Sequence, residues 1–202
     1  GVPPVLGVSR YKFYGDNNQV TSAAFPDNVA AIIVDNTGAV SDNTVFISFL
    51  AGLPTITVQD SIFVNKGIFD SYDRDIVLMG DFYLENDGEF VPGDESLELQ
   101  GDYDHEFRLD NAAGLQLYDL VLNFDGGASN DNKILLTRPD EPTSDNEAHL
   151  YIENDLTFEQ AVIIDGRDAV RKVILETAAS SVVQNDTEDG WVDGYLGKYF
   201  SS

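Results

Sequence analysis

The chain has no cysteine, and it has few basic residues. Without cysteine neither a disulfide framework nor a thiolate metal site can form, so stability must come from packing. Only 11 lysines and arginines stand against 36 aspartates and glutamates, which gives a net charge of −25. Such a surface repels phosphate backbones and anionic membranes, so we expect no nucleic-acid partner.

The sequence also has no run of 18 apolar residues, so neither a membrane-spanning segment nor direct membrane insertion is expected. Its first residues, Gly1-Val2-Pro3-Pro4, lack the basic region and apolar stretch of a signal peptide, so the signal of a longer parent would lie outside this chain. Hydrophobic residues make up 43% and aromatic residues 11%, which is enough for a packed core. We therefore expect a folded chain.

A short pattern recurs after 21 residues. Leu78-Met79-Gly80-Asp81-Phe82 returns as Leu99-Gln100-Gly101-Asp102-Tyr103, an apolar strand followed by a Gly-Asp corner and an aromatic residue. A unit of this size cannot bury its own apolar face and must stack on its neighbours. We predict an all-β fold, a β-solenoid (parallel β-helix-like) built of stacked coils of about 21 residues, with little or no helix.

Local patterning also favours β structure, because the apolar segments are short, rich in β-branched or aromatic residues, and bounded by Gly, Asn, Asp or Pro. Alternation places Leu97 and Leu99 on one face, and likewise Leu120 and Leu122, so we expect these four leucines to point into the core. The predicted strands are Ala31–Val34, Thr44–Phe49, Thr55–Val58, Ile76–Leu78, Leu97–Leu99, Leu117–Leu122, Lys133–Leu136, His149–Ile152 and Val170–Leu175.

A longer echo joins the two halves of the chain. The segment Tyr11–Gln19 corresponds to Leu97–His105 at an offset of 86 residues, and Ile56–Ile62 corresponds to Leu150–Leu156 at an offset of 94. An offset that grows along the chain indicates insertions at corners. Two polar segments rich in turn-forming residues, Asn130–Asn132 and Pro139–Asp145, are the expected insertions.

These echoes define the expected domain organisation. We interpret residues 1–202 as a single continuous solenoid segment that contains two diverged repeats, approximately 11–96 and 97–190. Residues 190–202 are interpreted as the start of a following module or linker.

Several motifs carry a resemblance to a known group of proteins. Phe13–Gln19, followed by Val29–Asn36 and Gly38–Val40, is similar to the pattern F-x-G-x-x-x-Q … L-x-I-N-N-x-x-G-V. Phe82–Phe90 resembles its N-x-G-x-F coil, and Gly190–Tyr199 resembles its closing V-x-G-x-L-x-K segment. The pattern is that of β-solenoid repeat regions in giant Bacteroidetes cell-surface proteins, gliding-type adhesins among them, which are type IX secretion substrates. The resemblance implies a repetitive stalk or adhesive segment without an active site.

One corner could carry chemistry. Asp102, Asp104, His105 and Glu106 lie together in the sequence, and a histidine beside carboxylates can act as a base with a raised pKa. Carbohydrate-active right-handed β-helix enzymes use carboxylates of this kind. The competing interpretation is a solvated acidic corner, which we favour because aspartate is dense throughout the chain. His149 has no second histidine at metal-ligand spacing and is expected to be structural.

Calcium binding is a more serious possibility than catalysis, because Ca²⁺ binds carboxylate, amide and carbonyl oxygens, which the corners rich in Asp and Asn supply. The candidate ligands with the densest spacing around a glycine are Asp186, Glu188, Asp189 and Asp193. They do not fit the EF-hand loop, because Thr187 and Leu196 occupy two of its ligand positions. A second acidic group consists of Asp140, Glu141, Asp145 and Glu147. Apart from this calcium hypothesis, no cofactor is expected.

The predicted function is a non-enzymatic structural and adhesive segment, a stalk or filament repeat of a large bacterial surface protein, with an extracellular or cell-surface location. The alternatives are a carbohydrate-active β-helix enzyme and a glycan-binding module. Neighbouring repeats of the same long chain, or end-to-end self-association, are expected to cover the open strand edges of a solenoid. Surface glycans are candidate partners because exposed aromatic residues stack on sugar rings; the candidates are Tyr72, Tyr83, Tyr103, Tyr118 and Trp191.

Overall fold

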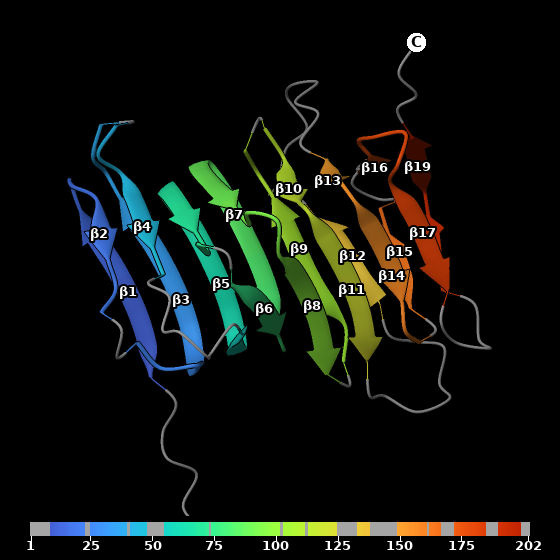
Figure 1. Cartoon of the computed structure of the whole chain (residues 1–202), viewed down its shortest axis with the longest axis horizontal. Helices are drawn as coiled ribbons and strands as arrows, with labels where there is room; N and C mark the ends of the chain where they lie inside the picture. The colour runs from blue at the N-terminus through green and yellow to red at the C-terminus, as the bar shows by residue number, and fades with distance from the viewer. Residues whose placement is uncertain are drawn as a thin grey trace, which may run out of the picture.

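The structure is a computed structural model, and all regular structure in its described residues is β (Figure 1). It has nineteen strands and no helix in these ranges, which confirms the all-β prediction. Within them no helix is long and apolar enough to cross a membrane. The described residues are 9–22, 25–39, 41–47, 55–72, 74–101, 103–111, 113–124, 133–137, 149–160, 162–166, 172–184 and 190–198.

Most strands fall into three rows of parallel neighbours. Row A contains β6 (Asp75–Leu78), β8 (Ser96–Gly101), β11 (Asp119–Phe124), β14 (Asp155–Phe158) and β17 (Ser181–Gln184). Row B contains β1 (Arg10–Gly15), β3 (Asn28–Asn36), β5 (Thr55–Asp70), β7 (Asp81–Val91), β9 (His105–Leu109), β12 (Lys133–Thr137), β15 (Ile163–Asp165) and β18 (Trp191–Asp193). Row C contains β10 (Leu115–Leu117), β13 (Leu150–Ile152), β16 (Lys172–Leu175) and β19 (Tyr195–Lys198).

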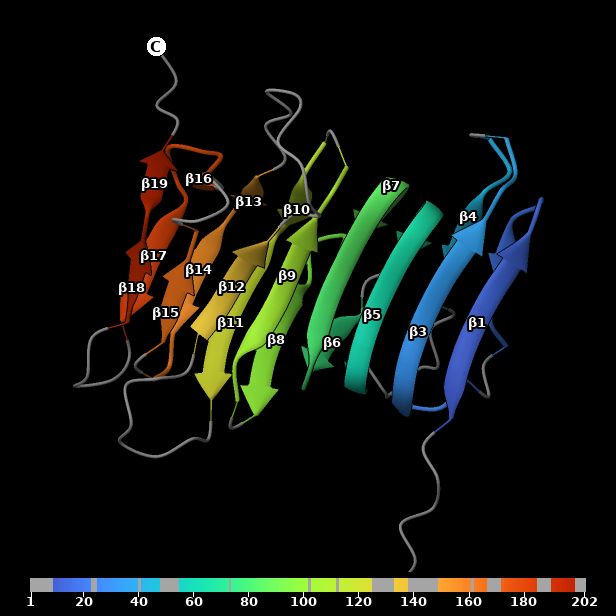
Figure 2. The same ribbon diagram turned by 180° about the vertical axis from the view of Figure 1, so that it is seen from behind.

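The long strand β5 joins rows A and B into one strongly curled sheet of fifteen strands (Figure 2). Its first residues pair with β6 in row A, and its later residues pair with β7 in row B. Two short strands, β2 (Gln19–Val20) and β4 (Thr44–Phe46), belong to the same sheet. β4 pairs with the last residues of β5, and β2 pairs with β4. Row C is a separate sheet of four strands.

From β8 onward the chain visits the rows in a fixed order. It passes from A to B to C in β8, β9 and β10, and it repeats this order in β11 to β13, β14 to β16 and β17 to β19. Each pass places its three strands beside the corresponding strands of the pass before. Every pairing among the described strands is parallel, as this order requires.

The core lies on the inner faces of the rows. Side chains alternate along each strand, and the four leucines predicted to point inward, Leu97, Leu99, Leu120 and Leu122, are all buried. The predicted correspondence of Leu78 with Leu99 is confirmed, because these residues are register partners in β6 and β8. Burial of whole rows of apolar side chains against one another supplies the main stabilising term of such a fold.

The predicted coil length of about 21 residues is found at some register pairs and not at others. Register partners are 21 residues apart at Ile76 and Leu97 but 36 apart at Leu120 and Leu156. The physical reason is that the backbone ladder fixes only the residues within strands, whereas the connections between strands can vary in length. The predicted insertions Asn130–Asn132 and Pro139–Asp145 fall within the 36-residue step and lie outside the described residues.

The two glycines of the repeated Gly-Asp corner are needed for different reasons. A Cβ atom at Gly80 would lie 1.6 Å from the carbonyl oxygen of Asp60, so only glycine allows the two backbones to approach. Gly101 has more room, with 3.5 Å to the nearest side-chain atom, but its φ of +133° disfavours other residues. One corner is set by close packing and the other by backbone conformation.

We predict that Gly80→Ala destabilises the protein more than Gly101→Ala does. The first change forces two backbones apart and is expected to cost about 3 kcal/mol, while the second is expected to cost about 1–2 kcal/mol of backbone strain. Urea unfolding followed by circular dichroism measures both values. Gly197→Ala is the matched control, because its Cβ would meet only ordinary contacts from 3.4 Å outward. Equal stability of the Gly80 variant and the control would contradict this account.

Candidate functional site

His105 is a core residue and not a solvated base. It is 0% exposed, and its Nδ1 atom is hydrogen-bonded to the carbonyl oxygen of Gly80. Its ring stacks on Tyr103 at 5.2 Å between centroids and meets the edge of Phe124 at 4.8 Å. Burial lowers the pKa of His105, although the Gly80 carbonyl and nearby aspartates act in the opposite direction. The expectation of a raised pKa at this corner is therefore wrong.

The neighbouring carboxylates do not converge on His105. Asp104 is exposed, and its side chain accepts a hydrogen bond from the backbone N–H of Lys133 at 2.9 Å. Glu106 follows His105 in β9, so its side chain lies on the outer face while that of His105 lies inside. Asp102 lies outside the described residues. The described residues of this corner, Asp104, His105 and Glu106, therefore do not form an acid–base arrangement around the histidine.

Carboxylates bonded to the backbone of a neighbouring strand recur through the fold. In each case an aspartate at or near the start of one strand accepts an N–H from the first or second residue of the strand beside it, which satisfies a donor that would otherwise be unpaired. This explains why aspartates gather at the corners of the chain. The pairs are Asp75 with Ser96 (3.1 Å), Asp81 with Glu106 (2.8 Å), Asp104 with Lys133 (2.9 Å) and Asp119 with Asp155 (2.8 Å).

The outer face of row B holds a compact polar cluster around Tyr83. The Tyr83 hydroxyl donates to Asp81 at 2.9 Å and lies 3.5 Å from Glu106, so it bridges carboxylates on two adjacent strands. Glu106 also accepts from the Thr137 hydroxyl at 2.5 Å. Burial raises the pKa of Tyr83, and the hydrogen bond to Asp81 and the charges of both carboxylates raise it further.

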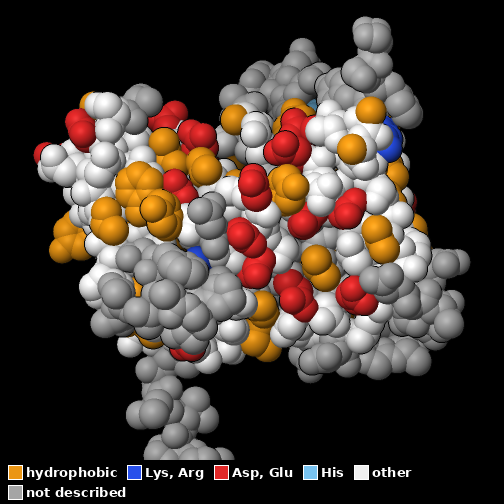
Figure 3. All heavy atoms as spheres, in the orientation of Figure 1, with side chains coloured by type: hydrophobic (Ala, Val, Ile, Leu, Met, Phe, Trp, Pro, Cys, Tyr) orange, Lys and Arg blue, Asp and Glu red, His pale blue; other side chains and the backbone are white. Residues whose placement is uncertain are grey.

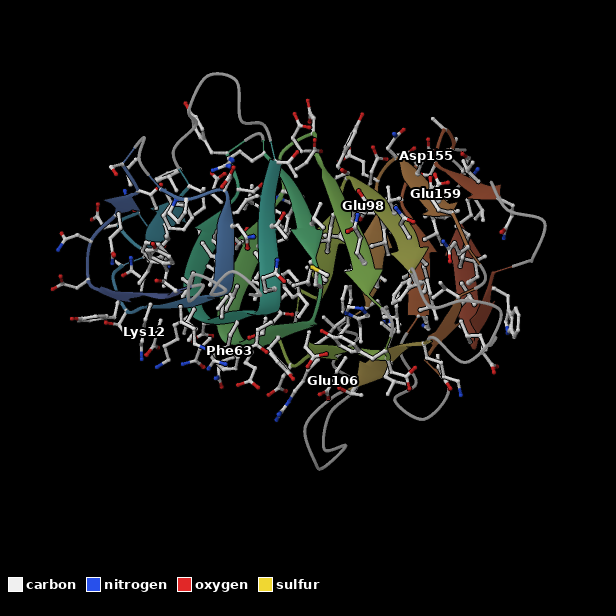
Figure 4. All side chains as sticks on the ribbon, turned by 90° about the horizontal axis from the view of Figure 1, so that it is seen from below. Lys12, Phe63, Glu98, Glu106, Asp155 and Glu159 are labelled. Carbon is white, nitrogen blue, oxygen red and sulfur yellow. The ribbon has the colours of Figure 1, made fainter. Side chains whose placement is uncertain are left out.

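Apolar and charged groups surround this cluster. The ring of Phe63 is half-buried and lies 5.9 Å from that of Tyr83, and these two aromatic residues are register partners on β5 and β7. Arg108 forms an ion pair with Glu85 at 3.3 Å on the same face. Figure 4 shows Phe63 and Glu106 on one side of the molecule, together with Lys12. Row B thus presents aromatic rings beside hydrogen-bond acceptors.

The opposite face, over row A, is acidic. Figure 4 shows Glu98, Asp155 and Glu159 on this side, and Figure 3 shows acidic side chains spread across its middle. Glu98 accepts hydrogen bonds from the amides of Gln100 (2.8 Å) and Asn123 (2.7 Å). The row A strands contain no lysine or arginine, so neutral amides and hydroxyls take the place of cations there.

The calcium hypothesis remains a prediction. Three of its candidate ligands, Asp186, Glu188 and Asp189, lie outside the described residues, as does the whole second group from Asp140 to Glu147. Asp193 ends β18, where it is the register partner of Asp165. Among the residues that the structure describes, no group of three or more histidines, aspartates or glutamates is arranged to hold a metal ion.

Row C carries a small basic hollow. A cavity of about 210 Å³ is lined by residues of β16 and β19, and its two cations are Lys172 and Lys198. The ammonium of Lys172 lies 5.3 Å from the ring centroid of Tyr195, which is a cation–π contact. His149 is buried nearby, and its Nδ1 atom accepts from the backbone N–H of Lys172 at 3.4 Å, in keeping with the structural role expected of it.

The aromatic residues singled out for sugar stacking are dispersed. Tyr72, Tyr103 and Trp191 are exposed, while Tyr83 and Tyr118 are half-buried. Only Tyr83 has a second aromatic ring and two carboxylates beside it on the same face. The sequence analysis named Tyr83, Glu106 and Asp81 separately, the last only in the repeated Gly-Asp corner, and it missed Phe63. The four residues lie on three strands that only the register brings together.

Comparison with models of protein families, with curated proteins and with solved structures finds no match to this chain. Any inference about the function of this chain therefore rests on the geometry and chemistry of its own residues.

We predict that protonation of His105 lowers the free energy of unfolding at pH values under about 6.5. Because the folded-state pKa is lowered, stability is present above the ordinary histidine pKa of about 6.5 and is lost as the pH falls toward the folded-state value. The slope due to one proton is at most about 1.4 kcal/mol per pH unit. His105→Gln keeps a donor for Gly80 but does not titrate, so this variant should lack that component.

Urea midpoints of both proteins between pH 8 and pH 5 measure the difference. The variant also serves as the control for the carboxylates, whose titration affects both proteins equally. Parallel curves over the whole range would contradict the assignment of His105 as a neutral core residue.

Proposed function

We propose that this chain is a β-solenoid segment of a large cell-surface protein, with a structural and adhesive function and no catalytic role. The observation that carries the proposal is the repeated passage of the chain through rows A, B and C in the same order. An order of this kind is typical of a chain that winds around one axis and lays each coil on the last. The coils in this proposal have corners of variable length.

A solenoid gives length along one axis. Row B contains eight strands, and steps of about 4.8 Å between them correspond to a rod of roughly 34 Å. A rod extends by adding coils, whereas a globular domain is limited by the size of its core. A protein built from many such segments can hold a binding region far from the cell.

The surface chemistry favours a role outside the cell or at its surface. A net charge of −25 keeps a repetitive chain from aggregating. Many carboxylates are also committed to structure, because they bind backbone N–H groups or neighbouring amides. Carboxylates used in this way support a structural interpretation of the acidic composition over a catalytic one.

The solenoid proposal predicts that one whole coil can be removed. Deletion of residues 76–96 joins Asp75 to Leu97, which takes the position of its register partner Ile76. The shortened protein should unfold cooperatively, and small-angle scattering should show a rod about 4.8 Å shorter. Deletion of residues 76–86 is the control, because it removes about half a coil and displaces every later strand from its row. Equal damage from both deletions would count against stacked coils.

A second candidate function, glycan binding, is favoured by the face around Tyr83. Half-buried rings of Phe63 and Tyr83 offer apolar surface to a sugar ring, and the carboxylates of Asp81 and Glu106 accept hydrogen bonds from sugar hydroxyls. A chain with a net charge of −25 repels anionic polysaccharides, so neutral glycans are the matching class.

For this second function we expect Phe63→Ala to weaken binding to a neutral polysaccharide at least about tenfold, the loss that about 1.4 kcal/mol of stacking would produce. Affinity electrophoresis against soluble glucans, mannans and galactans measures it. Tyr72→Ala is the control, since Tyr72 is exposed but lies outside row B. If the unaltered protein binds none of these polysaccharides, the glycan-binding proposal fails and the structural proposal is unaffected.

A further inference from the structure

The two ends of the strand rows expose most of the large apolar side chains that reach solvent. Six of the eight exposed large hydrophobic residues in the described part of the chain lie on β1, β2, β17, β18 and β19. The six are Tyr14, Val20, Val182, Trp191, Tyr195 and Leu196.

At the end formed by β17 to β19 the core itself is open. Val182 continues the buried line of Leu120 and Leu156, yet it is 40% exposed. Leu196 continues the line of Leu150 and Val173 and is 46% exposed. Both side chains point where a further layer of core would lie, and no described strand covers them. An apolar cross-section of this kind is a docking surface.

The opposite end carries a matching apolar cluster. Tyr11 and Phe13 of β1 point to the same side as their buried register partners Ile32 and Val34. Phe25 packs on both rings, at 4.7 Å from Tyr11 and 6.2 Å from Phe13. These three side chains are only partly buried, so this end also offers apolar surface.

The ends also match in charge at one defined position. One line of residues crosses the whole of row B, and its two terminal residues have opposite charge. They are Asp193 on β18 and Arg10 on β1, which is exposed and forms an ion pair with Asp60 in its own copy. The line runs through Arg10, Ala31, Ser61, Asp81, Glu106, Leu135, Asp165 and Asp193. Every step is a register pair except the one from Asp81 to Glu106, which lies one residue before the pair Phe82 and Phe107 and is joined by the Glu106 N–H donating to the Asp81 side chain.

We propose that two copies of this chain associate head to tail. The edge of β18 in one copy pairs in parallel with the edge of β1 in the next, and no described strand of the same chain pairs with either edge. Because β1 and β18 run in the same direction at opposite ends of row B, translation along the row is sufficient to bring the edges together. The register then places Asp193 of one copy beside Arg10 of the other. Both edges gain backbone hydrogen bonds, and the open core is covered.

Pairing of like ends is disfavoured by the same charges. Two copies joined through β18 would bring the two Asp193 side chains to one contact. Two copies joined through β1 would bring together Arg10 and Lys12, whose ion pairs with Asp60 and Asp35 reduce this repulsion. Head-to-tail contact is heterologous and does not close, so it produces open chains of copies and not a fixed dimer.

Sedimentation equilibrium over a wide range of protein concentration tests this proposal. The net charge of −25 opposes association, so the measurement is made at physiological ionic strength, where the Debye length is about 8 Å. The weight-average mass is expected to rise with concentration beyond that of a dimer. A strict monomer would overturn the proposal, and so would a dimer that does not grow.

Charge reversal tests the register. Arg10→Glu and Asp193→Lys should each weaken association about tenfold or more, because each places like charges at the contact. An equimolar mixture of the two variants should associate again, since each mutant end then meets an opposite charge. A variant that had merely unfolded could not be rescued in this way.

Lys12→Glu is the matched control. It makes the same charge change on the same strand but in a line whose partners do not lead to Asp193. Association of this variant should remain within about threefold of the unaltered protein. Equal loss in all three variants, or no recovery on mixing, would overturn the proposed register. Head-to-tail pairing needs only the row B edges, so its failure would leave the proposed surface role untouched.

Discussion

The whole structure depends on the register of its parallel backbone ladders. A shift of one residue in any strand would turn every inward side chain outward, so register partners must share the same side of the sheet. The lines of partners accordingly have a common character. Ile56, Ile76, Leu97, Leu120 and Leu156 form one apolar line in row A, while the residue before each of the last four is a small polar or acidic one.

This constraint also accounts for much of the acidic composition. The first residue of a strand has a backbone N–H that is easily left unpaired, and a carboxylate on the neighbouring strand satisfies it, as at Asp75 with Ser96 and at Asp119 with Asp155. The aspartates that resemble catalytic groups in the sequence are therefore part of the frame. Each further corner adds such aspartates, so the net charge becomes more negative as the number of corners increases.

The sequence predicted the fold where its pattern is short and local. The repeat of Leu78 at Leu99 predicted a true register pair, and alternation predicted the inward leucines. The sequence-based prediction failed where the same apolar pattern occurs both within a strand and across a corner. The predicted strand Leu117–Leu122 is two strands that meet at Tyr118, since apolar residues continue through the corner. Nothing local distinguishes a corner flanked by leucines from the middle of a strand.

The candidate site was harder to predict for a different reason. His105 sits among acidic residues in the sequence, yet alternation within β9 turns it into the core while Glu106 faces outward. Charge density along the chain says little about which groups share a face. The cluster of Asp81, Tyr83 and Glu106 exists only because strands 25 residues apart are held in register, and such pairings need the three-dimensional ladder.

The unequal steps between register partners have a consequence for how this chain can change. Ile56 and Ile76 are 20 residues apart and Leu120 and Leu156 are 36 apart, yet both pairs occupy the same buried line. The packing of the buried line is thus insensitive to the number of residues between one of its strands and the next. New loops, and the binding specificities that loops carry, can be acquired at the corners while the rows stay as they are.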